Sequence, residues 1–178
     1  GDENPSGKLT ATFPRSVGQI PIFYNHKNTG RPLGNKEGKF EKFKTTYIDE
    51  RNEPLFPFGF GLSYTTFDFQ LSQINEKNTF HIGDTLKVDI GIRNTGSRKG
   101  TEVVQCYLKS LQTNEIRPIQ ELIQFQRISL NANETSIQEL QFNLNHDLSA
   151  FGLLPGDYEI QIGSSSKDIR ALVSFSIQ

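Results

Sequence analysis

From residue 63 to the C-terminus, apolar and polar positions alternate along the chain. Phe67, Phe69 and Leu71 occupy every second position, and similar stretches follow within residues 86–92, 104–108, 122–130, 140–144, 158–162 and 169–177. Turn residues such as Asn, Gly and Pro separate these stretches. Because the side chains of a strand point alternately to its two faces, the pattern predicts about seven half-buried β-strands and no convincing helix.

About seven short strands joined by turns predict an all-β fold, a two-sheet β-sandwich of the immunoglobulin or fibronectin type III kind. The chain has one cysteine and no tryptophan, so the cysteine pair and buried Trp of an antibody domain are absent and the fibronectin-like version is favoured. Cys106 falls in register with Val104 and Leu108. We therefore expect it to be a small buried apolar group.

Residues 1–62 show neither strand alternation nor a helical period. They hold six of the 8 prolines, at positions 5, 14, 21, 32, 54 and 57, and proline restricts both itself and the preceding residue. Short extended pieces are plausible at 8–13 and 19–24, but nothing there would enclose a core alone. We expect a largely irregular, extended segment that lies on another surface, and we divide the chain into residues 1–62 and 63–178.

Charge and composition narrow the classes of partner. The 19 basic and 20 acidic residues give a net charge of -1, and no long run of like charge favours a nucleic-acid partner. No apolar run approaches the roughly 18 residues of a membrane span. A chain that begins Gly-Asp-Glu-Asn-Pro, without Met, is expected to be a processed product or a fragment. The residues alone leave the compartment open.

Residues able to carry chemistry are scattered. No histidine has another histidine or the cysteine at ligand spacing, so we expect no metal site and no cofactor; the histidines are His26, His81 and His146. A cluster of carboxylates precedes the aromatic stretch at Asp49, Glu50 and Glu53, without an apolar pocket to raise a pKa for general-acid work. We interpret it as a polar loop, and we assign no catalytic residue.

Several long segments closely resemble the C-terminal part of family 3 glycoside hydrolases of the β-glucosidase type. They are GKLTATFPRSVGQIPIFYNHKNTGRP (7–32), EPLFPFGFGLSYTTF (53–67), NTGSRKGTEVVQCYL (94–108) and PGDYEIQIGSSSKDIR (155–170). The resemblance covers nearly the whole chain, and its later part is similar to the family's fibronectin type III-like domain. Departures are Thr10, where the family has proline, Phe56 and Phe60, where it has tyrosines, and a shorter loop between Ser149 and Leu154.

The resemblance implies a parent with a (β/α)8-type barrel, an α/β sandwich and then the fibronectin-like domain. Such a parent cleaves terminal β-linked glucose with retention of configuration through a covalent intermediate. The family's nucleophile and acid/base residues lie upstream of the segments matched here, which implies a non-catalytic C-terminal fragment with a structural, interdomain role. Its expected partners are the catalytic domains of the same polypeptide, and the family favours a periplasmic or secreted location.

The aromatic-glycine stretch EPLFPFGFGLSYTTFDF (53–69) is expected to pack between domains. The proposed packing residues are Phe56, Phe58, Gly59, Phe60, Gly61 and Tyr64. The glycines permit tight bends or a close backbone approach, and the rings bury large apolar area. The alternative is a sugar-stacking platform. In the loop YNHKNTGRP, His26 and Arg31 are candidates for the rim of the parent's active site.

Two other functions remain open at this stage. The chain would be a stand-alone carbohydrate- or protein-binding module with β-glucan or an oligosaccharide as candidate ligand, or a free-standing hydrolase that uses its generic carboxylates. In isolation, residues 1–50 would be mobile, refolded onto the sandwich, or buried in a chain–chain contact, because their apolar side chains lose their cover.

Overall fold

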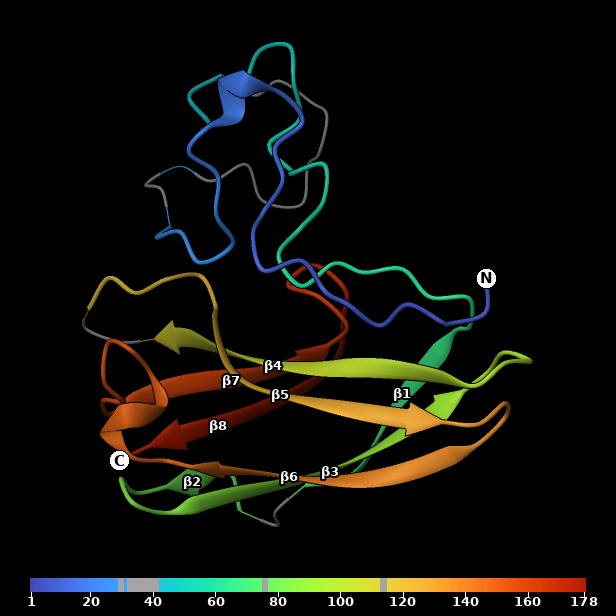
Figure 1. Ribbon diagram of the computed structural model, residues 1–178. Coiled ribbons are helices and arrows are strands. Elements are labelled where there is room, and N and C mark those ends of the chain that lie inside the picture. Colours follow the sequence, from blue (N-terminus) through green and yellow to red (C-terminus); the bar gives the residue numbers. More distant parts are fainter. Residues whose placement is uncertain (29–30, 32–41, 75–76, 113–114) are drawn as a thin grey trace.

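The structure is a computed structural model that describes residues 1–28, 31, 42–74, 77–112 and 115–178. Figure 1 shows a β-sandwich with a separate lobe above it. The lobe consists of the described residues from 9 to 58, while residues 1–8 run along the top of the sandwich. Two short 3₁₀ turns, η1 (Val17–Gln19) and η2 (His146–Leu148), are the helical elements of the described residues.

The sandwich has two sheets. The three-stranded sheet has the order β1-β3-β6 and is antiparallel, with β1 (Phe67–Ile74), β3 (Thr85–Asn94) and β6 (Thr135–Asn143). The five-stranded sheet has the order β2-β8-β7-β4-β5, with β2 (Thr79–Phe80), β8 (Ile169–Ile177), β7 (Gly156–Gly163), β4 (Gly100–Gln112) and β5 (Glu121–Leu130). Within it, the β2–β8 pair is parallel and the other pairs are antiparallel.

The predicted all-β sandwich is confirmed, and each predicted strand is present as β1 or as one of β3 to β8. The sequence pattern missed β2 because two residues are too short for an alternation. The stretches 8–13 and 19–24 form no strand; Phe13 makes only an isolated bridge with Phe56. No helix among the described residues is long and apolar enough to cross a membrane.

The core lies between the sheets, where the alternating apolar positions meet. Val88, Ile90 and Ile92 of β3 are fully buried, and they face a layer that includes Val104 and Cys106 of β4. Cys106 is therefore the small buried group that its register predicted. Burial raises the pKa of its thiol to about 12, so the thiol stays neutral and unreactive at physiological pH.

Tyr158 closes the turn before β7 in the manner of a tyrosine corner. Its side chain is fully buried and stacks on Phe175 with ring centroids 5.6 Å apart. Its hydroxyl donates to the Leu154 carbonyl oxygen at 2.8 Å and accepts from the Leu154 amide at 3.1 Å. One hydroxyl thus satisfies both backbone groups of the residue that leads into the turn Pro155-Gly156.

Arg170 joins the two sheets at the end where β8 begins. Its guanidinium donates to the Phe67 carbonyl oxygen of β1, on the opposite sheet. Asp168 holds it through contacts to Nε at 3.0 Å and to Nη2 at 2.7 Å, and Ser164 donates to the same carboxylate at 2.6 Å. The hydrogen bond from Arg170, helped by the one from Ser164, lowers the pKa of Asp168.

We predict that Tyr158→Phe lowers the free energy of unfolding by about 2 kcal/mol, because the partly buried amide and carbonyl groups of Leu154 both lose their partner. Thermal and urea unfolding of the chain measure the change. Tyr64→Phe is the matched control, since that ring is 56% exposed and its hydroxyl should contribute less than about 0.5 kcal/mol. Equal effects of the two substitutions would contradict the role given to Tyr158.

We predict that the stabilising effect of Asp168 disappears in acid. The folded-state pKa is lowered, so its contribution is complete above the unfolded pKa near about 4 and is lost as pH falls through the folded value. Urea unfolding from pH 7 to pH 2 should show wild type more stable than Asp168→Asn at neutral pH, with the difference shrinking below about pH 4. A difference in the free energy of unfolding that stays constant across that pH range would contradict the role given to the Asp168 carboxylate.

Candidate functional site

The lobe meets the sandwich on the outer face of β4, and this contact is the candidate functional site. Gln105 and Tyr107 point away from the core but are only 3% and 0% exposed. The docking face consists of these two residues and the β7–β8 loop at residues 164–166, which is also buried. Both faces of β4 are therefore covered, one by the core and the other by the base of the lobe.

The docking face contacts the lobe at Gly59. Its φ is +79°, and a Cβ here would lie 2.0 Å from Gln105 Oε1 and 2.9 Å from the Tyr107 hydroxyl. The Gln105 amide nitrogen donates to the Gly59 carbonyl oxygen at 3.1 Å and to the Ser164 carbonyl oxygen at 2.6 Å. The Tyr107 hydroxyl donates to Gln105 Oε1 at 2.5 Å. The Gln105 side chain thus has both its donors and its oxygen engaged.

Two aromatic rings extend this contact. Phe58 stacks on Tyr24 with centroids 4.1 Å apart, and Tyr24 meets Tyr107 edge-on at 5.9 Å. The Ser166 amide donates to the Phe58 carbonyl oxygen at 3.0 Å. Burial, with a smaller effect from Tyr24, raises the pKa of Tyr107, so Tyr107 keeps the proton that it donates to Gln105.

The other members of the aromatic-glycine stretch lie elsewhere. Phe56 and Phe60 contact each other, with centroids 5.0 Å apart, and neither is fully buried. A Cβ on Gly61 would lie 2.5 Å from the Gly7 carbonyl oxygen, so this glycine allows residues 7–8 to pass close by. Tyr64 projects outward. The structure therefore brings Phe58 and Gly59, but not all six predicted packing residues, onto the docking face.

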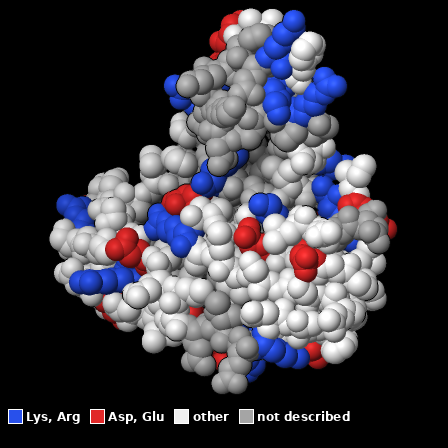
Figure 2. All heavy atoms as spheres, turned by 180° about the vertical axis from the view of Figure 1, so that it is seen from behind, with Lys and Arg blue, Asp and Glu red and all other residues white. Residues whose placement is uncertain are grey.

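A largely buried ion pair holds residues 7–8 of the N-terminal segment against β4 of the sandwich. Lys8 Nζ lies 2.7 Å from Glu102 Oε1 on β4, with side chains 16% and 9% exposed. The same carboxylate oxygen accepts from the Val103 amide at 2.7 Å. Such a pair is costly to break because either partner alone would be a poorly solvated charge. On the face seen in Figure 2, the sandwich surface carries intermixed positive and negative charges.

The loop that carries His26 and Arg31 is anchored to the sandwich by its backbone. The Ile119 amide donates to the His26 carbonyl oxygen at 3.0 Å, and Lys27 forms a bridge with Pro118. Both the His26 and the Arg31 side chains are exposed, and no described contact joins them. Part of the loop, at 29–30 and 32–41, lies outside the described residues.

The described residues contain no group of three His, Cys, Asp or Glu side chains that would hold a metal ion. His81 and His146 are exposed, and Asp49, Glu50 and Glu53 lie in turns of the lobe. A pocket of about 500 Å³ opens in the lobe. It is lined by residues from 21–28, 45–47 and Asn52, including the rings of Phe23 and Tyr47.

The sequence reasoning missed Gln105 and Tyr107, because a strict alternation assigns the outward positions of β4 to solvent. It also missed Tyr24, which lies in the irregular segment 1–62, where no periodic pattern indicates a contact. One signal was available. Val103 and Tyr107 are apolar or aromatic at outward positions, so the run from Val103 to Leu108 lacks the polar face of a half-buried strand. Lys8 and Glu102 carry no such signal, since charged residues are normally expected at the surface.

Comparisons with known proteins match two separate ranges of the chain to two family models. Residues 1–64 match the glycosyl hydrolase family 3 C-terminal domain, and residues 102–166 match the fibronectin type III-like domain. A periplasmic beta-glucosidase of Salmonella typhimurium is 40% identical over 177 residues, which cover 96% of this chain and 22% of the relative. A putative beta-xylosidase of Formosa agariphila is 36% identical, with 96% and 21% covered.

Solved structures show the same correspondence. The beta-glucosidase from Listeria innocua in complex with isofagomine superposes with a TM-score of 0.88 at 34% identity, over 99% of this chain and 25% of that one. A beta-glucosidase from Erythrobacter marinus gives 0.82 at 33% identity, over 100% and 22%. The chain spans about a fifth to a quarter of the length of these relatives. It therefore belongs to the family 3 glycoside hydrolases and corresponds to their C-terminal part, including the fibronectin type III-like domain.

Proposed function

We propose that the chain is the non-catalytic C-terminal part of a glycosidase that removes terminal β-linked glucose with retention of configuration. Relatives named beta-glucosidases support a hydrolase of this type, although other relatives, among them two proteins of Formosa agariphila, are named beta-xylosidases. The resemblance to the family implies that the catalytic pair lies upstream of the matched region, and a retaining mechanism uses such a pair as nucleophile and acid/base. The role proposed for this chain is to hold the domains together.

The observation that carries the proposal is a lobe without a core. Among the described residues from 1 to 58, Gln19 alone is buried. Its side chain accepts from the Arg15 amide at 2.6 Å and donates to the Arg51 carbonyl oxygen at 2.7 Å. Apolar side chains such as Val17 and Ile48 are 84% and 88% exposed. Hydrogen bonds hold the lobe together, while the apolar area that would stabilise it faces outward.

The occupant that fits this surface is the preceding part of the same polypeptide. Residues 1–64 match the family 3 C-terminal domain, and the chain spans 22% of the Salmonella relative, so other parts of such a parent would cover the exposed apolar side chains. Burying each large side chain would contribute about 1.5–3 kcal/mol. We propose a domain boundary near residue 62. Phe56, Phe60 and Tyr64, which are not buried against the sandwich, are available for packing between domains.

The loop with His26 and Arg31 is proposed to lie at the rim of the parent's active site. Both side chains are exposed, and the loop is tied down at two places. Besides the contact of His26 with Ile119, the Arg31 carbonyl oxygen accepts from the Thr45 amide at 2.8 Å. An imidazole and a guanidinium on an anchored loop are suited to hydrogen bonding with sugar hydroxyls. Because one relative is named periplasmic, we propose a periplasmic or secreted location for the parent.

A carbohydrate-binding module is the second candidate, and the lobe pocket favours it. A volume of about 500 Å³ suits a mono- or disaccharide, and the half-exposed rings of Phe23 and Tyr47 offer faces for stacking. A flat platform on the three-stranded sheet is disfavoured. The exposed side chains among the described positions of β1, β3 and β6 include no aromatic ring.

We predict that the purified chain does not hydrolyse aryl β-glucosides or aryl β-xylosides, whereas the full-length parent does. Both proteins should be assayed at equal molar concentration, with an aryl α-glucoside as the control substrate. Turnover by the chain that is lost on replacing Asp49 or Glu50 would overturn the proposal. Calorimetric titration of the chain with soluble β-glucan distinguishes the second candidate function from the first, because a saturable heat of binding would favour a carbohydrate-binding module.

We predict that Gly59→Ala releases the lobe from the sandwich, because the added methyl group overlaps Gln105 and Tyr107. Hydrogen exchange should show at least tenfold less protection at the Ser166 amide, which donates to Phe58. Gly83→Ala is the matched control. It has φ +97° but no atom within 4 Å of its Cβ, so it isolates backbone strain of about 1–2 kcal/mol. Equal loss of protection at Ser166 in both variants would contradict the steric argument.

A further inference from the structure

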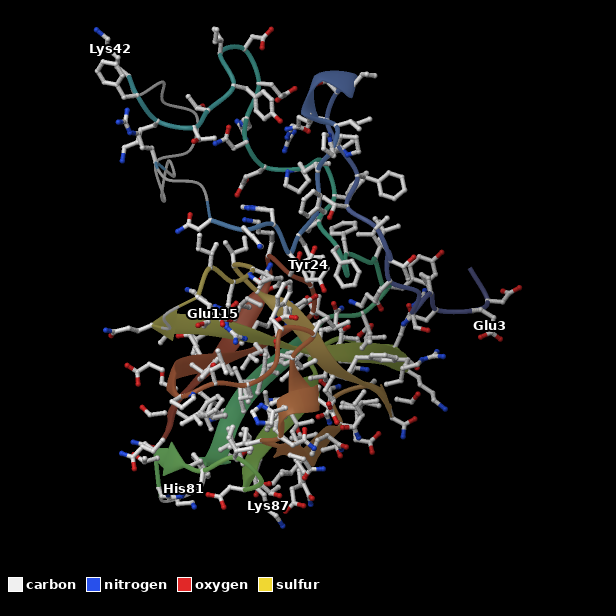
Figure 3. All side chains as sticks on the ribbon, turned by 90° about the vertical axis from the view of Figure 1, so that its left-hand side faces the viewer. Glu3, Tyr24, Lys42, His81, Lys87 and Glu115 are labelled. Carbon is white, nitrogen blue, oxygen red and sulfur yellow. The ribbon has the colours of Figure 1, made fainter. Side chains whose placement is uncertain are left out.

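The sandwich contacts the His26 loop through the segment that joins β4 to β5. The connector, residues 115–120, receives the loop backbone at Pro118 and Ile119. Just beyond it, the Leu122 amide donates to the Tyr24 hydroxyl at 3.2 Å. Figure 3 shows Tyr24 at the seam between lobe and sandwich, with Glu115 on the sandwich side of it. The loop is therefore held immediately before and after His26.

The connector is itself fixed from the other side. The buried Arg117 donates to the Gly152 carbonyl oxygen at 2.6 Å and to the Phe151 carbonyl oxygen at 3.2 Å. Gln120 donates to the Ser166 carbonyl oxygen at 3.1 Å. Two loops of the sandwich thus hold the connector at both of its ends, so it presents a defined backbone to the His26 loop.

Two side chains of the loop segment complete the attachment. The Tyr24 ring is held between Phe58 and Tyr107, which sets the position of its hydroxyl. Lys27 Nζ lies over the Phe151 ring at 5.9 Å from the centroid. Phe151 belongs to the loop whose carbonyl oxygens accept hydrogen bonds from Arg117. In contrast, the exposed His26 side chain does not contact the connector. Its ring contacts the Lys27 carbonyl oxygen and meets the Phe23 ring edge-on, with centroids 6.5 Å apart.

We propose that the β4–β5 connector positions the loop that carries His26 and Arg31, and that the Tyr24 hydroxyl is a positioning group for substrate binding in the parent enzyme. The inference rests on the proposed place of this loop at the active-site rim. The sandwich then acts on substrate affinity through backbone contacts, without touching the substrate. The ligand is the neutral sugar that the loop faces, and the reacting atoms are not affected.

The test compares Tyr24→Phe with Tyr64→Phe in the full-length parent. Tyr24→Phe keeps the ring and removes only the acceptor for the Leu122 amide. We expect KM for a β-linked disaccharide to rise about fivefold, the equivalent of one lost hydrogen bond, with kcat within twofold. Tyr64→Phe should leave both constants unchanged. Lys27→Met, which removes the cation but keeps the side-chain stem, should raise KM about twofold.

Arg31→Ala separates failure of this inference from failure of the proposed rim. If Arg31→Ala raises KM and Tyr24→Phe does not, the rim stands and the positioning role is overturned. If Arg31→Ala leaves KM unchanged, the rim proposal falls and the inference falls with it. If Tyr24→Phe lowers kcat and the melting temperature without raising KM, Tyr24 has only a structural role and the inference is overturned. The inference is also overturned if Tyr24→Phe fails to fold and the KM of Lys27→Met equals that of wild type.

Hydrogen exchange on the chain itself gives a readout independent of activity. In Tyr24→Phe, the Leu122 and Ile119 amides should lose about fivefold of their protection, while the amides of β3 stay as protected as in wild type. Unchanged exchange at both amides would show that the hydroxyl does not hold the loop on the connector, and would overturn the proposal whatever the kinetics show.

Discussion

The organisation of this chain depends on one buried carboxamide. Gln105 lies between the backbone of the lobe at Gly59 and that of the β7–β8 loop at Ser164, with Tyr107 on its oxygen. A buried polar group is tolerated only when its partners are complete, and here each partner comes from a different segment. An apolar side chain of the same size would leave two carbonyl oxygens and a hydroxyl without partners, so the contact specifies the docked arrangement as well as stabilising it.

The same constraint explains why an irregular segment rich in proline and glycine holds one position. With Gln19 as the single buried residue among its described positions, the lobe does not fold by hydrophobic burial of its own. It is ordered by attachment at the docking face, at the Lys8–Glu102 ion pair and at the His26 loop, and proline lowers the entropy that each attachment must overcome. The exposed apolar side chains that remain are those that we propose to face the rest of the parent.

The sandwich was predictable from the sequence because inward-facing apolar residues recur at every second position along each of its longer strands. Alternation identified the seven longer strands and assigned Cys106 to the core, since inward positions recur every second residue. The docking face followed no such rule. Gln105 meets Gly59 across 46 positions of sequence, and Leu122 meets Tyr24 across 98. The aromatic-glycine stretch signalled a contact, but composition did not indicate that Gly59 and Phe58 reach β4 while Tyr64 points outward.

In the arrangement that we propose, the sandwich influences substrate binding without touching the substrate. Its influence does not require a ligand of its own or a moving part. Arg117 and Gln120 hold the connector, the connector holds the backbone at His26 and Lys27, and the aromatic rings fix Tyr24 between them. Because each step is a backbone or ring contact in a packed environment, small displacements are resisted at every step. Natural selection for the position of the loop would therefore act on sandwich residues such as Gln120, which contact no substrate. In the structure of the sandwich alone, such residues look like ordinary core or turn residues, so their effect on substrate binding would not be recognised.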